Sequence, residues 1–194
     1  SASSVRADLV NETAVATMID VVDSQFGRLD ALVLNASGGL EWGADPEYAQ
    51  RLNCDAQVRL AHSVLPLMPQ HGRLVFVTSH QAHFHGVKPV PADYVPIAAS
   101  KRAGEDALRS MRPLLAERGI ELVVVSGDMV DGTIIVRLLE RRDPTAVIAR
   151  REAAGGLPTV AEFAQAVTRA VDDPSPGETI YVGGSDYLSA ANRS

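Results

Sequence analysis

Short apolar segments alternate with longer amphipathic segments along the chain. Four apolar runs have the length of strands and are predicted to be buried: Ala31–Ala36, Gly72–Ser79, Ile120–Gly127 and Glu178–Gly184. Four segments with apolar residues at helical spacing lie before and between them: Asn11–Gly27, Asp45–Met68, Ala98–Gly119 and Thr159–Asp173. Alternation of this kind predicts parallel strands joined by right-handed crossovers, and hence an α/β fold.

Local signals mark some of the helix ends. Thr159 and Glu162 form a Thr-x-x-Glu capping box, which predicts the start of a helix. Pro113 is expected to kink or loosen the last turns of the helix that ends near Gly119, because proline removes a backbone donor and clashes with the preceding turn.

The first predicted strand, Ala31–Ala36, is apolar on both faces, which is typical of a central strand. Only about ten residues precede the first predicted helix, too few for a comparable strand beside it. An apolar strand with an open edge favours pairing with another chain. We therefore expect the sheet to continue in residues outside this sequence, or to be completed by a partner chain.

Composition limits the classes of function. The net charge of −6 and the lack of a basic stripe argue against nucleic-acid binding. No apolar run approaches the ~20 residues that span a bilayer, and the first residues have no apolar signal core, so neither a membrane partner nor export is expected. The single cysteine, Cys54, cannot form an internal disulfide, which favours the reducing cytoplasm.

Six local motifs narrow the fold further. They are ADLVNETAV with Asp8, the run Asn35-Ala36-Ser37-Gly38, RLNCDAQ with Asn53, GRLVFVTSHQ with Ser79, AASKRAGEDAL with Lys101, and VVVSGDMVDGT with Gly127 and Thr133. In this order and spacing they resemble the short-chain dehydrogenase/reductase family, from its third strand to its last, over essentially the whole chain. The resemblance implies one domain over residues 1–194, a Rossmann-like doubly wound parallel sheet in three α/β/α layers, incomplete at its N-terminal side.

The resemblance also implies an activity. Members of the family are oxidoreductases that use NAD or NADP to transfer a hydride to or from a small-molecule carbonyl or secondary alcohol. In the family's pattern Ser79 holds the substrate oxygen, Asn53 anchors a water of the proton relay, and Lys101 holds the ribose. Asp8 would face the adenine. The residues expected to contact the dinucleotide are Asp8, Leu9, Asn35, Ala36, Ser37, Lys101, Gly127, Met129 and Thr133.

The family pairs the helices that correspond to about residues 45–68 and 98–119 across a two-fold axis, which implies a homo-oligomer, a dimer or tetramer.

One departure from the family concerns the dinucleotide. The glycine-rich turn between the family's first strand and helix, which cradles the pyrophosphate, is not in this sequence. The family's first two strands are therefore expected to lie outside the chain, and a truncated chain is the simplest explanation. The choice between NAD and NADP stays open, because the discriminating residues follow the second of those strands. Ser126 also replaces the proline of the family's Pro-Gly turn.

A second departure concerns the catalytic tyrosine. The family's Tyr-x-x-x-Lys motif sets the tyrosine one helical turn before the lysine, which lowers the pKa of the phenol. Ile97 stands at that position here and carries no proton. Tyr94 lies seven residues before Lys101, a rotation of about 700° in a helix, so the two would still share a face. We predict that Tyr94 is the catalytic acid/base, left on a loop by a helix that starts near Pro96. The alternative is that Tyr94 is only loop structure and the site is weak or inactive.

Other polar clusters leave further alternatives. His80, His83 and His85 follow a strand and are expected to line the substrate pocket, because a metal site would need more ligands in a defined geometry. His80 or His83 is an alternative proton donor. The arginines of ERR (140–142) and ARRE (149–152) are interpreted as a solvated helix face. The alternative function is a non-catalytic relative that acts as a nucleotide-binding or regulatory module.

Overall fold

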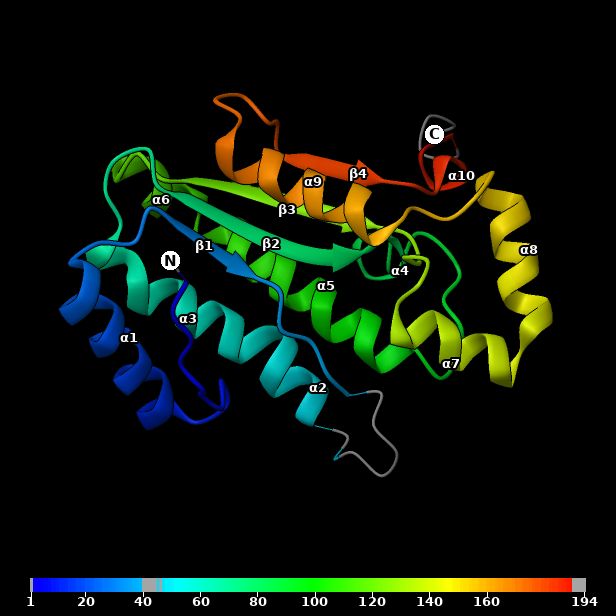
Figure 1. Ribbon diagram of the computed structural model, residues 1–194, viewed down its shortest axis with the longest axis horizontal. Helices are drawn as coiled ribbons and strands as arrows, with labels where there is room; N and C mark the ends of the chain where they lie inside the picture. Colours follow the sequence, from blue (N-terminus) through cyan, green and yellow to red (C-terminus); the bar gives the residue numbers. More distant parts are fainter. Residues whose placement is uncertain (1, 40–44, 46, 190–194) are drawn as a thin grey trace.

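The computed structural model describes residues 2–39, 45 and 47–189 of the chain. Within them four strands form one parallel sheet in the order β1 (Ala31–Leu34), β2 (Arg73–Ser79), β3 (Glu121–Gly127) and β4 (Thr179–Val182). Each strand lies inside one of the predicted apolar runs, and helices connect the strands (Figure 1). The predicted α/β fold with a parallel sheet is confirmed.

Helices cover both faces of the sheet. On one face α1 (Glu12–Phe26), α3 (Ala56–Val64), α5 (Val95–Ser110) and α6 (Arg112–Glu117) enclose a core that includes Leu74, Phe76 and Val124. Side chains alternate across a strand, so Val75, Val123 and Val125 point to the other face. There α9 (Val160–Asp172) packs against them. The three-layer α/β/α arrangement follows from this alternation.

The helical segment predicted over 45–68 is built from several pieces. It consists of α2 (Tyr48–Gln50), a π-helical turn at Arg51–Asp55, α3, and a 3₁₀ turn at Leu65–Leu67. The π turn contains Asn53, and α5 packs closely against it at Gly104. A Cβ atom built at Gly104 would lie 2.5 Å from the carbonyl oxygen of Asn53. Short π segments inside α-helices are rare and frequently occur at functional sites.

Two predicted helix signals are confirmed. The helix before Gly119 breaks, with α5 ending at Ser110 and α6 beginning at Arg112, and Pro113 stands in the first turn of α6. Thr159 caps α9, and Glu162 completes the reciprocal capping box.

Several short elements lie beyond the carboxyl ends of the strands. They are α4 (His80–His83), α7 (Ile134–Arg142), α8 (Pro144–Ala154) and α10 (Ser185–Ser189), and the arrowheads of β2, β3 and β4 point toward them in Figure 1. In the described part of the chain β1 pairs with β2 alone, and Val33 of β1 is 39% exposed. A neighbour on the open side of β1 stays a prediction.

None of the helices among the described residues is both long and apolar enough to cross a membrane.

Candidate active site

The carboxyl edge of the sheet gathers the polar residues that the sequence singled out. Ser79 ends β2 and Gly127 ends β3, and the two are direct neighbours in the strand ladder. The strands are parallel, so the loop after Leu34 of β1 leaves from the same edge. In open α/β sheets ligands bind at this edge, outside the carboxyl ends of the strands.

Ser79 and Tyr94 meet at this edge, although they come from different segments. The Ser79 Oγ and the Tyr94 hydroxyl are 3.3 Å apart. Tyr94 directly precedes α5, which begins at Val95 with Pro96 in its first turn, as the sequence predicts. Ser79 also caps α4 by accepting a hydrogen bond from the backbone N–H of Ala82 at 3.2 Å. Accepting this bond leaves the hydroxyl proton of Ser79 free to be donated into the site.

The pKa of the Tyr94 phenol is raised above its ordinary value, mainly because the ring is buried. The hydrogen bond with Ser79 opposes this shift and is the smaller effect. Tyr94 therefore carries its proton at neutral pH, which is the state that a general acid needs.

Lys101 lies on α5 and is partly buried. Burial lowers the pKa of its amine to about 8. In the described part of the chain the amine has no hydrogen bond or ion pair. Such a group can donate to a ligand without first breaking a bond inside the protein.

Ile97 fills the position where the family's tyrosine stands. It is 3% exposed and belongs to the buried side of α5. The site therefore has a packed aliphatic side chain at this position, and the phenol within hydrogen-bonding distance of Ser79 is that of Tyr94.

Asn53 is 1% exposed and bonds to two neighbouring segments. Its amide nitrogen donates to the Gly38 carbonyl oxygen and to the Ser100 hydroxyl, both at 3.0 Å, and its amide oxygen accepts from the Gly38 N–H at 3.1 Å. These bonds tie the loop after β1 to α5. The role of Asn53 in anchoring a water stays a prediction. In the structure its side chain makes hydrogen bonds to Gly38 and Ser100.

Gln57 is a residue that sequence reasoning missed. It is 1% exposed, and its amide nitrogen donates to the Ala36 carbonyl oxygen at 3.1 Å. Together with Asn53 it fixes the loop that carries the predicted cofactor residues. The sequence signal that could have pointed to Gln57 is its position four residues after Asn53, which places both side chains on the same face of a helix.

The predicted cofactor residues fall into three groups. Asn35, Ala36 and Ser37 are exposed on the loop after β1. Gly127 ends β3, and Met129 and Thr133 follow it, with Thr133 capping α7. Asp8 and Leu9 lie in the turn before α1, where Asp8 accepts from the Val10 N–H at 3.0 Å and Leu9 packs against the core. The first two groups share the carboxyl edge with Ser79.

A side chain at the position of Gly127 would have to displace the ring of Phe163. A Cβ atom built there would lie 2.2 Å from the ring of Phe163 on α9. The exposed loop at Asn35–Ser37, the close turn at Gly127 and the amine of Lys101, which is unpaired within the described part of the chain, fit the nicotinamide half of a dinucleotide.

Two of the histidines after β2, His80 and His83, are held by contacts inside the protein. His80 is 1% exposed, so it does not line an open pocket. His83 contacts the buried carboxylate of Glu105 through Nδ1 at 3.0 Å and the Tyr181 hydroxyl through Nε2 at 3.2 Å. No group of three or more His, Cys, Asp or Glu side chains among the described residues has a geometry that holds a metal ion.

Arg150 corrects the interpretation of its segment as a solvated helix face. Only 14% of its side chain is exposed, and it makes ion pairs with Asp128 at 2.6 Å and Asp186 at 2.8 Å. The guanidinium also lies over the ring of Tyr187, 4.8 Å from its centre. Arg150 thus joins α8 to the turn after β3 and to α10, beside the carboxyl edge.

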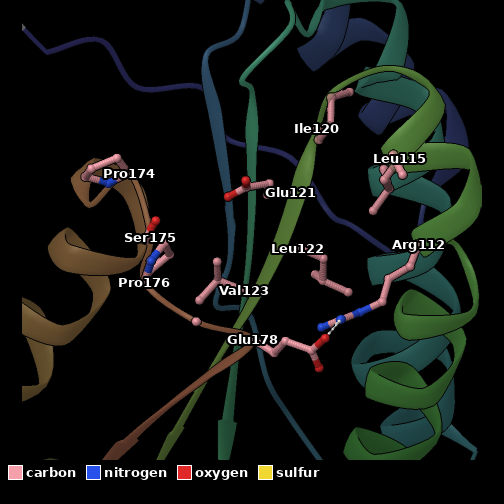
Figure 2. A pocket seen from close by; sticks show the side chains of 12 residues that line it. Arg112, Leu115, Ile120, Glu121, Leu122, Val123, Pro174, Ser175, Pro176 and Glu178 are labelled. Carbon is pink, nitrogen blue, oxygen red and sulfur yellow. Dashed lines mark ion pairs between the residues drawn. The ribbon is translucent and has the colours of Figure 1, made fainter.

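A concave surface lies at the opposite end of β3 from Gly127. It has a volume of about 480 Å³ and is lined by α6, the start of β3 and the loop before β4 (Figure 2). Arg112 and Glu178 form an ion pair across it, and Leu115 and Leu122 supply apolar walls. None of the predicted site residues lies in this cavity.

Comparison with known proteins decides the family. A family model of the short-chain dehydrogenase type, described as Enoyl-(Acyl carrier protein) reductase, matches residues 1–184. The chain belongs to the short-chain dehydrogenase/reductase family. No curated protein sequence matches it.

Solved structures of this family share the fold of the chain. The angucycline C-6 ketoreductase LanV, which has NADP bound, gives a TM-score of 0.74 at 23% identity, over 94% of this chain and 75% of LanV. The reductase LugOII, which performs a keto-reduction in lugdunomycin biosynthesis, gives 0.71 at 24% identity, over 93% and 76%. A short-chain dehydrogenase family protein from Francisella tularensis gives 0.76 at 18% identity, over 97% and 84%. At these identities the likeness shows the Rossmann-like fold, as predicted.

Proposed function

We propose that this short-chain dehydrogenase/reductase is an NAD(P)-dependent oxidoreductase that reduces a carbonyl or oxidises a secondary alcohol. The observation that carries the proposal is the approach of the Ser79 and Tyr94 hydroxyls to 3.3 Å at the carboxyl edge of the sheet. The two groups come from segments fifteen residues apart in the sequence and meet where a substrate oxygen would bind.

The two hydroxyls have complementary tasks in the reduction. Ser79 donates a hydrogen bond to the substrate oxygen and holds it against Tyr94. Tyr94 donates a second hydrogen bond and then gives its proton to that oxygen as negative charge develops on it. The bound cofactor supplies the hydride chemistry. Burial raises the pKa of Tyr94, so the phenol keeps its proton at neutral pH and is in the protonated state that carbonyl reduction requires.

Lys101 and two loops would hold the cofactor. The amine of Lys101 has no partner in the described part of the chain, and we propose that it donates to the ribose hydroxyls. The exposed loop at Asn35, Ala36 and Ser37 and the turn from Gly127 through Met129 to Thr133 would position the nicotinamide. Asp8 and Leu9 would contact the adenine end.

Turnover tests the proposal directly. The protein is mixed with millimolar NADH or NADPH and a panel of ketones and aldehydes, and oxidation of the cofactor is followed by its absorbance. We expect turnover with at least one carbonyl, lost in Ser79→Ala. Turnover that survives unchanged in Ser79→Ala would contradict the proposed site.

The second candidate function is a non-catalytic nucleotide-binding module, and the burial of Ile97 favours it. Ile97→Tyr separates the two candidates because it restores the family's spacing to Lys101. If Tyr94 already acts, the larger ring crowds a packed position and activity falls. A gain of activity in Ile97→Tyr, with none in the wild type, would favour a site that has lost its acid.

We also propose that the protein works in the cytoplasm as a homo-oligomer with a small-molecule substrate. The helices α3 and α5 pack beside each other and carry the segments that the resemblance places at a two-fold interface. Light scattering at micromolar concentration should give a dimer or tetramer, and a monomer alone would contradict this part of the proposal.

A further inference from the structure

His80 directly follows the proposed catalytic serine and is fixed at both ring nitrogens. Its Nδ1 lies 2.8 Å from the Ser126 Oγ on β3, and its Nε2 lies 3.0 Å from the carbonyl oxygen of Gly183, just after β4. The ring is 1% exposed and Ser126 is fully buried. One side chain at the end of β2 therefore contacts the ends of both following strands.

The direction of each hydrogen bond is determined by chemistry. The carbonyl oxygen of Gly183 can only accept, so the proton of the neutral ring is on Nε2. The Nδ1 atom is then an acceptor, and the Ser126 hydroxyl donates to it. Burial lowers the pKa of His80 and outweighs the opposing effects of the Gly183 carbonyl and Asp128, so the ring stays neutral at neutral pH.

Close packing holds the ring in this orientation. A Cβ atom built at Gly184 would lie 2.6 Å from the His80 Cδ2 atom, so only glycine fits there. The rings of Phe84 and Tyr187 have their centres 6.0 and 5.1 Å from the centre of the imidazole. Neither nitrogen can change partner without moving the backbone at the end of β4 or the aromatic side chains.

The contact with Ser126 has a specific place in the site. Ser126 stands immediately before Gly127, and Gly127 is the ladder neighbour of Ser79. The family's pattern has proline at the position of Ser126, and proline has no hydroxyl to donate. The His80–Ser126 hydrogen bond therefore depends on the serine that replaces the family's proline in this sequence.

We propose that His80 and Ser126 form a positioning pair that sets the Ser79 hydroxyl relative to the Gly127 turn. The proposal rests on the proposed function, because it assigns these residues to the placement of its serine. His80 acts through the backbone that it shares with Ser79. Loss of the bond lets the end of β2 shift against the end of β3, and the Ser79 Oγ moves with it.

Thr78 offers a matched control. It is the ladder neighbour of Ser126, it is 3% exposed, and its buried hydroxyl has no hydrogen-bond partner among the residues that the structure describes. Thr78→Val removes a hydroxyl from the same layer of the sheet without removing a hydrogen bond. Any general effect of changing polarity in this layer appears in Thr78→Val as well as in Ser126→Ala.

The first experiment compares Ser126→Ala, Ser126→Thr and Thr78→Val in the turnover assay. We expect Ser126→Ala to lower kcat by roughly ten- to a hundred-fold with little change in KM, since misplacing a catalytic group costs rate more than binding. Ser126→Thr keeps the hydroxyl and should recover most of the rate, and Thr78→Val should match the wild type. Equal rates in Ser126→Ala and Thr78→Val would overturn the pair.

The second experiment does not depend on turnover. In a crystal structure of Ser126→Ala the distance between the Ser79 Oγ and the Tyr94 hydroxyl should lengthen beyond hydrogen-bonding range, and in Thr78→Val it should stay near 3.3 Å. An unchanged distance in Ser126→Ala overturns the pair, whether or not the protein is an enzyme. A changed distance in a protein without any turnover supports the pair as a link that positions Ser79 and overturns only the proposed function.

Discussion

At the scale of residues, the proposed acid of this site, Tyr94, reaches Ser79 because of where its loop folds and not because of its spacing along the helix. Tyr94 stands before the first turn of α5, so its ring reaches Ser79 from the loop side. Ile97 occupies the helical position and is buried in the core. The structure thus places a phenol beside Ser79 from a position that breaks the family's usual spacing.

Tyr94→Phe removes the proton while keeping the ring. We expect kcat to fall by about 10²-fold or more, the usual scale for loss of a general acid, with the fold unchanged. Stopped-flow or steady-state oxidation of NAD(P)H measures the effect. Tyr181→Phe is the control, because that exposed tyrosine bonds only to His83 among the described residues and should keep the wild-type rate. Equal rates in both variants would remove Tyr94 from the mechanism.

The amine of Lys101 should make stability depend on pH in a defined window. Its pKa in the folded state is about 8, below the ordinary 10.5, because burial disfavours the charge. Between these two values the unfolded chain binds the proton and the folded chain does not, so stability rises as the pH rises from 8 to 10.5. Below pH 8 both states are charged and the penalty for burial is complete.

Denaturant unfolding of the wild type and of Lys101→Met measures this effect. Without cofactor, the advantage of Lys101→Met over the wild type should be largest below pH 8 and should shrink toward pH 10.5. The matched variant Lys88→Met changes the other lysine of the chain, which donates to the Asp186 carbonyl oxygen, and controls for the loss of a lysine as such. A constant difference between wild type and Lys101→Met across this range would contradict the burial of the amine.

At the scale of elements, the contact between α5 and the π turn fixes the geometry of the site. In an ordinary helix, glycine to alanine is stabilising by roughly 0.5–1 kcal/mol. At Gly104 the sign should reverse, because the added Cβ would lie 2.5 Å from the backbone oxygen of Asn53, which cannot move like the end of a side chain. We expect Gly104→Ala to destabilise by about 1–3 kcal/mol, the usual scale of overpacking.

Thermal unfolding of Gly104→Ala tests this contact. Ala107→Gly, one turn further along α5, is the comparison, and it should lose only the helix propensity of about 1 kcal/mol. Asn53 also connects to Ser100 and Gly38, so the loss in Gly104→Ala should spread to the loop after β1. A stabilised Gly104→Ala protein would mean that the two elements are not in close contact.

At the scale of the whole molecule, binding of the dinucleotide by residues 1–194 should be weak. The glycine-rich turn that cradles the pyrophosphate is not in this sequence, so the proposed contacts of the chain would reach only the nicotinamide half and the adenine end. We expect a dissociation constant above 1 μM for NADH and NADPH, measured by fluorescence titration. Lys101→Met should weaken it further, and submicromolar affinity of this chain would contradict the expectation.

The open side of β1 belongs to the same scale. Val33 is 39% exposed on a strand whose pattern is apolar on both faces. Such an edge favours strand pairing. Which strand or chain pairs with the open edge of β1 depends on the assembly. The apolar pattern of β1 indicates only that this edge has to be paired or covered.

The sequence by itself determined the four strands, the four helical segments that cover the sheet and their order, but not the short helices α4, α7, α8 and α10. Hydrophobic runs and their spacing gave the four strands, the parallel sheet and the break at Pro113, because a buried strand and an amphipathic helix each need a local pattern of apolar residues. The motifs indicated the family and the place of Ser79 at a strand end. These properties depend on residues that are close together along the chain, and the sequence shows those residues directly.

Only the tertiary structure decided which side chains meet. The approach of Tyr94 to Ser79, the use of Asn53 and Gln57 to fix a loop, and the ion pairs of Arg150 all join segments that are distant in sequence. His80 was expected to line a pocket and is instead buried between Ser126 and Gly183. The physical reason is that hydrogen bonds and burial depend on how strands and helices pack, and residue type and spacing do not specify that packing for a single polar side chain.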